Sequence, residues 1–182
     1  MAQLPRRVGH IGGDGQRQPS RPGRPGAPVR GALLPPAGKK IREGAERRQL
    51  DLLRGIVDLV VLARYMQIVT PQFLDDVDCP HINIHHSFLP AFIGAAPYRR
   101  AKELSVKLVG ATAHYVTENL DERPIIEQDV VRVDHRHSVD DPTRLGSDVE
   151  RALLSRAVLW HCEDHIIRHG NQTIVLSRSG SL

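Results

Sequence analysis

Residues 56–63 read Ile-Val-Asp-Leu-Val-Val-Leu-Ala, an almost unbroken apolar run that is rich in valine. A strand of a parallel sheet is covered on both faces, so its sequence lacks the alternation of apolar and polar residues that a half-exposed strand shows. This run therefore predicts a parallel strand that is buried on both faces.

Helical and extended patterns alternate on both sides of this strand. Helices are expected over 43–53 with Gly55 as the stop, from Pro71 with Thr70 as N-cap, over 97–104, and from 140 or 141 to 170. Strands are expected over 82–84, 108–116, 125–133 and 172–176. The long final helix is expected to bury Leu145, Val149, Ala152, Leu153, Leu159, Trp160 and Ile166. Such alternation predicts an α/β fold with a mostly parallel sheet, whose ligand lies beyond the carboxyl ends of the strands.

The first forty residues differ from the rest in composition. They contain eight Gly and seven Pro and carry a charge of +7, whereas residues 41–182 carry −3. Too little apolar area is available there to offset the entropy of ordering, so residues 1–40 are expected to be disordered and 41–182 to form one domain. A basic arm for nucleic acid, an organellar transit peptide and an inert or artefactual tail all stay open for this segment.

Composition excludes several classes of protein. Hydrophobic residues make up 40% of the 182 residues, as in soluble globular domains. No apolar run approaches the about 20 residues of a membrane span, and no secretory signal follows the N-terminal arginines. Cys79 and Cys162 can form neither a disulfide framework nor a four-cysteine zinc site. A cytoplasmic protein is expected, with neither a membrane nor, given its acidic body, a nucleic acid as partner.

Candidate chemistry lies at the end of the strand over 82–84. Asn83 and His85 are two residues apart, so their side chains point to the same side of an extended strand. An amide that donates hydrogen bonds beside an imidazole can stabilise a developing oxyanion and move a proton. The alternative is an Asn and a His engaged in loop hydrogen bonds, and spacing alone does not separate the two.

Other titratable residues have two interpretations each. Asp121 could orient a histidine or take a proton from water, or it could be a solvated turn residue. His114 is expected on the same side of its strand as Thr112, and taken alone it is interpreted as an ordinary histidine of the core. His161 and His165 are spaced as two zinc ligands on a helix, but a catalytic zinc site needs three protein ligands, so surface positions are expected. Asp134, His135 and His137 are expected to be solvated, and no metal site is expected.

Together these residues resemble the formyltransferase-type hydrolase domain that binds 10-formyltetrahydrofolate. The segment 83–90 reads NIHHSFLP and resembles the family signature N-I-H-x-S-x-L-P, and Asp121 follows His85 by 36 residues and His114 by 7, as in the family. Within that superfamily the chain is most similar to the formyltetrahydrofolate deformylases, from about residue 41 to 176. The stretches 62–68, 85–92, 110–117 and 125–130 carry this likeness.

The resemblance implies a Rossmann-like formyltransferase fold, with its early strands missing or replaced, and hydrolysis of 10-formyltetrahydrofolate to tetrahydrofolate and formate. It implies that Asn83 binds the formyl oxygen, that His85 moves a proton to N10, and that Asp121 holds His85 or activates water. His114 would support Asp121. The segment that would line the pterin pocket is Arg64, Tyr65, Met66, Gln67 and Ile68. The folate substrate is the only small molecule implied, with no metal or cofactor, and the formate would serve purine biosynthesis and one-carbon balance.

The sequence departs from the family in three places. Arg123 stands where the family usually has Gly, Ala96 where a deformylase often has Lys, and no room is left for an N-terminal ACT-type regulatory domain. Two alternatives to the hydrolase stay open: a formyltransferase that passes the formyl group to an amine, and a non-catalytic remnant of the family. A homo-oligomer also stays open.

Overall fold

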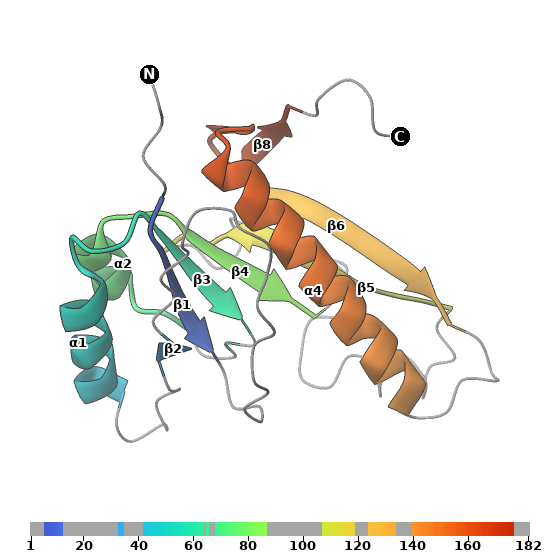
Figure 1. Ribbon diagram of the computed structural model, residues 1–182, viewed down its shortest axis with the longest axis horizontal. Helices are drawn as coiled ribbons and strands as arrows, with labels where there is room; N and C mark the ends of the chain where they lie inside the picture. Colours follow the sequence, from blue (N-terminus) through green and yellow to red (C-terminus); the bar gives the residue numbers. More distant parts are fainter. Residues whose placement is uncertain are drawn as a thin grey trace. The chain divides into compact units, whose positions relative to one another are not determined.

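The computed structural model describes residues 6–12, 33–34, 42–63, 65, 68–86, 107–118, 124–133 and 140–176 (Figure 1). The chain divides into two compact units. The first unit is Met1–Ile82 with Val116–Leu120, and the second unit is Asn83–Tyr115 with Asp121–Leu182. The helix expected over 97–104 lies outside the described residues.

The first unit contains parallel strands and two helices. Its elements are β1 (Val8–Gly12), β2 (Leu33–Leu34), α1 (Arg42–Leu53), β3 (Leu59–Ala63), α2 (Pro71–Val77) and the start of β4 (His81–His85). The strand order is β2-β1-β3-β4, and β1 pairs in parallel with both β2 and β3. The first four residues of β3 are buried, which confirms a buried strand in the apolar run, but the strand begins at Leu59 rather than Ile56, which is 51% exposed.

The helix ends of the first unit follow their sequence signals. Thr70 caps α2: its Oγ1 accepts the N–H of Phe73 at 3.2 Å and donates to Oε2 of Glu46 at 3.0 Å. Gly55 follows α1 with a φ of 65°, a conformation that only glycine adopts at little cost, and the chain turns there toward β3. Both signals are therefore confirmed as helix boundaries.

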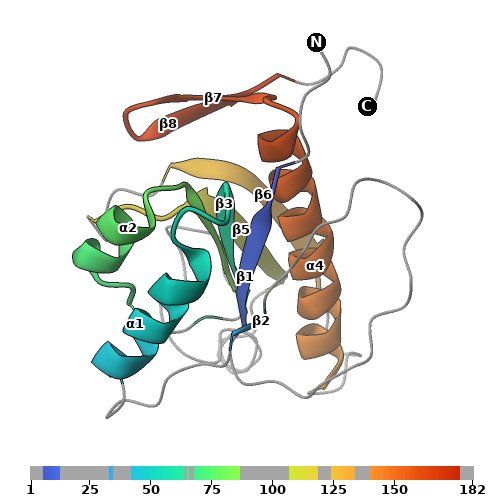
Figure 2. The same cartoon turned by 60° about the vertical axis from the view of Figure 1, so that its left-hand side comes forward.

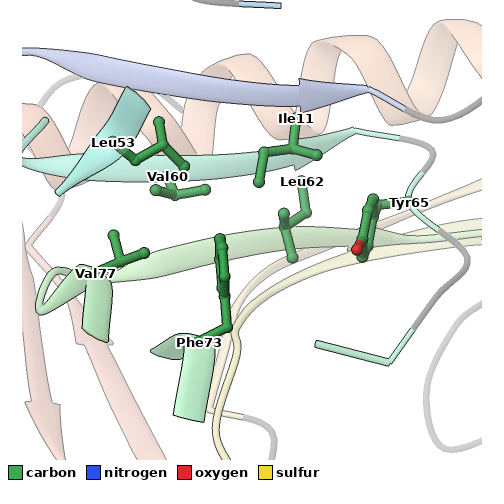
Figure 3. Close-up of a cluster of buried hydrophobic side chains, with 7 residues drawn as sticks. All are labelled: Ile11, Leu53, Val60, Leu62, Tyr65, Phe73 and Val77. Carbon is green, nitrogen blue, oxygen red and sulfur yellow. The ribbon is translucent and has the colours of Figure 1, made fainter. Parts of the chain in front are cut away.

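An apolar cluster forms the core of the first unit (Figure 3). Side chains from β1, β3, α1, α2 and the segment after β3 contribute to it: Ile11, Leu53, Val60, Leu62, Tyr65, Phe73 and Val77. Ile11 lies beside Leu62 because the parallel register pairs these two residues. Burying one side chain of this size stabilises a fold by about 1.5–3 kcal/mol, so β1 stabilises the first unit through Ile11.

Strand β1 corrects the expectation for the N-terminal segment. Disorder of residues 1–40 is wrong for Val8–Gly12 and Leu33–Leu34, which form strands. Ile11 is 1% exposed. The strand is also tied at its beginning, since Arg7 donates from its main-chain N–H to Oδ2 of Asp58 at 2.8 Å and from its guanidinium to Oδ1 at 3.2 Å. Most other residues of the segment 1–40 lie outside the described ranges, so the disorder expected there stays a prediction.

The second unit packs a long helix on antiparallel strands. Its elements are the end of β4, β5 (Leu108–Tyr115), β6 (Ile125–Arg132), α4 (Asp140–Cys162), β7 (Ile166–His169) and β8 (Gln172–Val175). The strands β4, β5 and β6 are neighbours in this order, and β5 and β6 are antiparallel. Helix α4 runs along β5 and β6, and the β7–β8 hairpin follows it (Figure 2). The α/β class is confirmed, with a mixed sheet.

Helix α4 differs from the sequence expectation in its end and its buried face. It ends at Cys162 rather than near residue 170, and Asp164, with a φ of 57°, precedes strand β7. Its buried positions are Gly146, Glu150, Leu153, Ala157 and His161. Leu153 fits the expected face, but Ala152 and Leu159 are exposed, whereas the polar Glu150 and His161 are buried. None of the described helices is long and apolar enough to cross a membrane.

Candidate active site

Asn83 and His85 lie on one side of β4, as their spacing predicts. Ile82 and Ile84, on the other parity, are 0% and 5% exposed, whereas Asn83 and His85 are partly exposed. The Oδ1 atom of Asn83 is buried, and no donor within the described part of the chain reaches it. A buried carbonyl oxygen without a hydrogen bond is costly, so this position suits a bound molecule that brings a donor.

Strand β5 adds two polar side chains to this face. It runs antiparallel to β4 (Figure 1), and the N–H of Val116 donates to the carbonyl of His81 at 2.9 Å. An antiparallel ladder continued from this bond places His114 beside Asn83 and Thr112 beside His85. Thr112 and His114 are 0% and 5% exposed. The geometry therefore groups three of the predicted site residues, Asn83, His85 and His114.

Hydrogen bonds orient both side chains of β5. Gln128 on β6 pairs with Thr112 across the ladder and donates from Nε2 to its Oγ1 at 3.0 Å. Nδ1 of His114 lies 3.0 Å from the carbonyl oxygen of Tyr115. Because a carbonyl only accepts, Nδ1 carries the proton, and in the neutral ring Nε2 is the basic nitrogen. Sequence reasoning gave Gln128 no role, although the residue lies in the stretch 125–130 that carries the family likeness.

Helix α4 contacts the other face of these strands. The hydroxyl of Tyr115 forms a hydrogen bond of 2.8 Å with Nδ1 of His161. The guanidinium of Arg156 lies 3.1 Å from Oδ2 of Asp129 on β6. Tyr115 has the opposite parity to Thr112 and His114, so the candidate site projects from the face that α4 does not cover.

The histidines of the final helix differ from expectation. His161 was expected on the surface, but it is 9% exposed and stacks edge-on against the ring of Tyr115. His165 lies beyond the end of α4, with Nδ1 3.5 Å from Oε2 of Glu163. No group of three or more His, Cys, Asp or Glu among the described residues could hold a metal ion. Asp134, His135 and His137 lie outside those residues.

The other predicted site residues fall in several places. Tyr65 is 8% exposed and packs in the apolar core of the first unit, and Ile68 is 57% exposed. The residues outside the described part of the chain are Arg64, Met66, Gln67, Asp121 and Arg123. The role of the segment from Arg64 to Ile68, and that of Asp121, therefore stay predictions.

Comparison with known proteins gives this arrangement a family. Residues 25–158 match the formyl transferase family. The chain belongs to this family. Formyltetrahydrofolate deformylases of Mycobacterium tuberculosis and Bacillus subtilis are 73% and 58% identical over 140 and 142 residues, which is 77% and 78% of this chain but 45% and 47% of theirs. This family member thus spans about half the length of the curated relatives it matches.

Solved structures of the formyl transferase family share its fold. A formyltetrahydrofolate deformylase of Pseudomonas syringae pv. tomato has a TM-score of 0.73 at 48% identity, covering 82% of this chain and 50% of that one. A glycinamide ribonucleotide transformylase of Symbiobacterium toebii has a TM-score of 0.69 at 33% identity, covering 82% and 71%. The expected formyltransferase fold and the resemblance to deformylases are confirmed. The deformylase and the transformylase share this fold, so the fold alone does not identify the reaction.

Proposed function

We propose that this chain hydrolyses 10-formyltetrahydrofolate to tetrahydrofolate and formate. The observation that carries the proposal is the common side of Asn83 and His85 on β4, with a buried Oδ1 of Asn83 to which no described residue donates. An amide beside an imidazole is the pair that formyl chemistry needs, one group for the oxyanion and one for the proton. Identity of 73% to a deformylase supports water as the acceptor.

Each group has one task in the proposed reaction. The oxygen of water adds to the formyl carbon, and the bond from that carbon to N10 then breaks. Asn83 donates from Nδ2 to the oxyanion, while its Oδ1 accepts a hydrogen of the attacking water. His85 gives a proton to the departing N10, and Asp121 takes a proton from the water and holds His85. One oxyanion donor of this kind accounts for about 10²–10³ in rate.

Other residues bind the folate in the proposed reaction. His114 supports Asp121 and the water, and the segment from Arg64 to Ile68 lines the pterin pocket, partly through main-chain groups. The folate is the only small molecule involved, without a metal or further cofactor. The formate serves purine biosynthesis and one-carbon balance in the cytoplasm. No nucleic acid or membrane takes part, and a homo-oligomer is compatible with the proposal.

Formate release without an amine acceptor tests the reaction. The folded chain, incubated with 10-formyltetrahydrofolate, is expected to release formate and tetrahydrofolate in equal amounts, and the Asn83→Ala variant serves as a matched control with little activity. A folded chain that binds the folate but releases formate no faster than the control contradicts the proposal.

Transfer to an amine is the second candidate, because the Symbiobacterium toebii transformylase shares the fold and this chain covers 71% of it. Consumption of 10-formyltetrahydrofolate only when glycinamide ribonucleotide is added would favour that reaction. A melting temperature that no folate raises would instead favour a non-catalytic remnant, since a ligand that binds the native state stabilises it.

A further inference from the structure

The residue after the catalytic pair makes a separate contact. His86 follows β4 and has the opposite parity to Asn83 and His85. Its Nδ1 lies 2.7 Å from Oε1 of Glu150, and the side chains are 20% and 7% exposed. Glu150 belongs to α4, which packs on the strands from the face opposite the candidate site. The backbone at this point therefore directs one histidine to the site and the next to the helix.

Glu150 stands out on the buried side of α4. Its neighbours there, Leu153 and Ala157, are both fully buried, and Glu150 itself is 6% exposed. A carboxylate in such surroundings is retained at a cost in stability unless a partner compensates it. The carboxylate oxygen accepts, so Nδ1 of His86 carries a proton, either in the neutral ring or in the imidazolium. The pair thus links the carboxyl end of β4 to the middle of α4.

We propose that His86 and Glu150 are positioning residues for the catalytic His85. This inference rests on the proposed function. His85 and His86 share a peptide bond, so the rotation of the chain that directs His86 to Glu150 also sets the direction of the His85 ring. A misplacement of about 1 Å in a reacting group can cost about 10²-fold in rate, and the contact with Glu150 restrains β4 at the place where such a shift would occur.

Exchanging the pair for an apolar contact separates positioning from stability. The double variant His86→Leu/Glu150→Leu removes both polar groups of this contact at once, so Glu150 is not left as a buried charge beside a lost imidazole, and we expect the fold to be retained. We expect its kcat for formate release to fall about 10-fold to 100-fold while KM changes by less than about 3-fold. His86→Asn keeps a donor near the place of Nδ1 and is expected to recover most of kcat.

The matched control removes another polar contact between α4 and the same sheet face. Arg156→Gln/Asp129→Asn breaks the ion pair of Arg156 with Asp129 on β6, and with it the longer one of Arg156 with Glu127 on the same strand. We expect this variant to keep the kcat of the original chain. A double His86/Glu150 variant that melts at the original temperature and keeps full kcat overturns the inference, as does an equal loss of kcat in the control.

Amide hydrogen exchange distinguishes failure of this inference from failure of the proposed function. We expect exchange at Ile84, His85 and His86 to rise at least about 10-fold in the Leu/Leu variant and to stay unchanged in the control. If the original chain releases no formate, the proposed function fails, and the exchange data still test the restraint on β4. Unchanged exchange at these three amides overturns the inference whatever the activity.

Discussion

The two units of the chain differ in how many polar side chains they bury. The core cluster of the first unit is made of seven apolar or aromatic side chains. Among the described residues the second unit buries four polar side chains, Thr112, His114, Glu150 and His161, at 0%, 5%, 6% and 9% exposure, and the first unit buries two, Gln49 and His81. Apolar burial stabilises without direction, whereas each buried polar group requires a partner in a fixed geometry. The difference indicates that the second unit depends more than the first on polar contacts of fixed direction.

Placing a charge in the apolar core of the first unit is expected to have the largest effect. In Ile11→Asp a carboxylate replaces a side chain that is 1% exposed beside Leu62. We expect a loss of about 4–5 kcal/mol in the free energy of unfolding, measured by urea denaturation. Ile11→Val is the matched control, with an expected loss of about 0.5–1.5 kcal/mol. Equal unfolding midpoints for both variants would contradict the place of β1 in the core.

Strands β1 and β3 show what the sequence can predict about the fold. The apolar run of β3 identifies a buried strand without further information. Strand β1 reads Val-Gly-His-Ile-Gly, with two residues of low strand propensity, and it lies before residue 25, where the family match begins. Its pairing with β3, about fifty residues later, makes it a strand. A contact between distant segments leaves no local pattern, so composition alone predicted disorder there.

Substitutions in the candidate site of the second unit are expected to lower activity rather than stability. Asn83→Ala and His85→Ala should each lower kcat/KM for 10-formyltetrahydrofolate by about 10²–10³, because in the proposed reaction one group binds the oxyanion and the other moves the proton. The double variant should be little worse than the poorer single variant, since groups that act as a unit fail together. His169→Ala, at an exposed position of β7, is the control. Strictly multiplicative losses would argue against a shared role.

Parity along strands explains how much of the candidate site the sequence predicts. The two-residue spacing places Asn83 and His85 on one face, and the same rule groups Thr112 with His114. The contacts of His86 with Glu150 and of Tyr115 with His161 join the end of β4 and β5 to a helix far along the chain. Only the packing of α4 on the strands creates these contacts, so spacing and family signature miss them. Asp121 stays a prediction from the family spacing.

A buried histidine makes the stability of the first unit depend on pH. Burial lowers the pKa of His81 to about 4, against a usual value of 6.5, although its Nδ1 donates to the carbonyl of Cys79 at 2.8 Å. The unfolded chain therefore binds this proton near pH 6.5 and the folded chain only near pH 4. Stability from His81 is fully present above pH 6.5 and is lost as the pH falls to 4, by about 3 kcal/mol.

The His81 effect is measured as a difference between two proteins. His81→Asn keeps a donor for the carbonyl of Cys79 but does not titrate. We expect its free energy of unfolding to fall less than that of the original chain between pH 6.5 and pH 4. Parallel curves for the two proteins over this range would show that protonation of His81 does not destabilise the first unit.

The smallest expected effect concerns the α4 face of the second unit. Tyr115→Phe removes the hydroxyl that meets Nδ1 of His161 at 2.8 Å and leaves that nitrogen buried, while the ring keeps its edge-on contact with His161 and the guanidinium of Arg168 5.7 Å from its centre. We expect a loss of about 1–2 kcal/mol in stability. Tyr115→Phe/His161→Leu should recover part of it, because the nitrogen that loses the hydroxyl is then removed as well. Since Tyr115 points to α4 and away from Asn83 and His85, kcat should stay unchanged. A fall in kcat as large as that of His86→Leu/Glu150→Leu would mean that all contacts of this face, and not His86 with Glu150 in particular, orient the site.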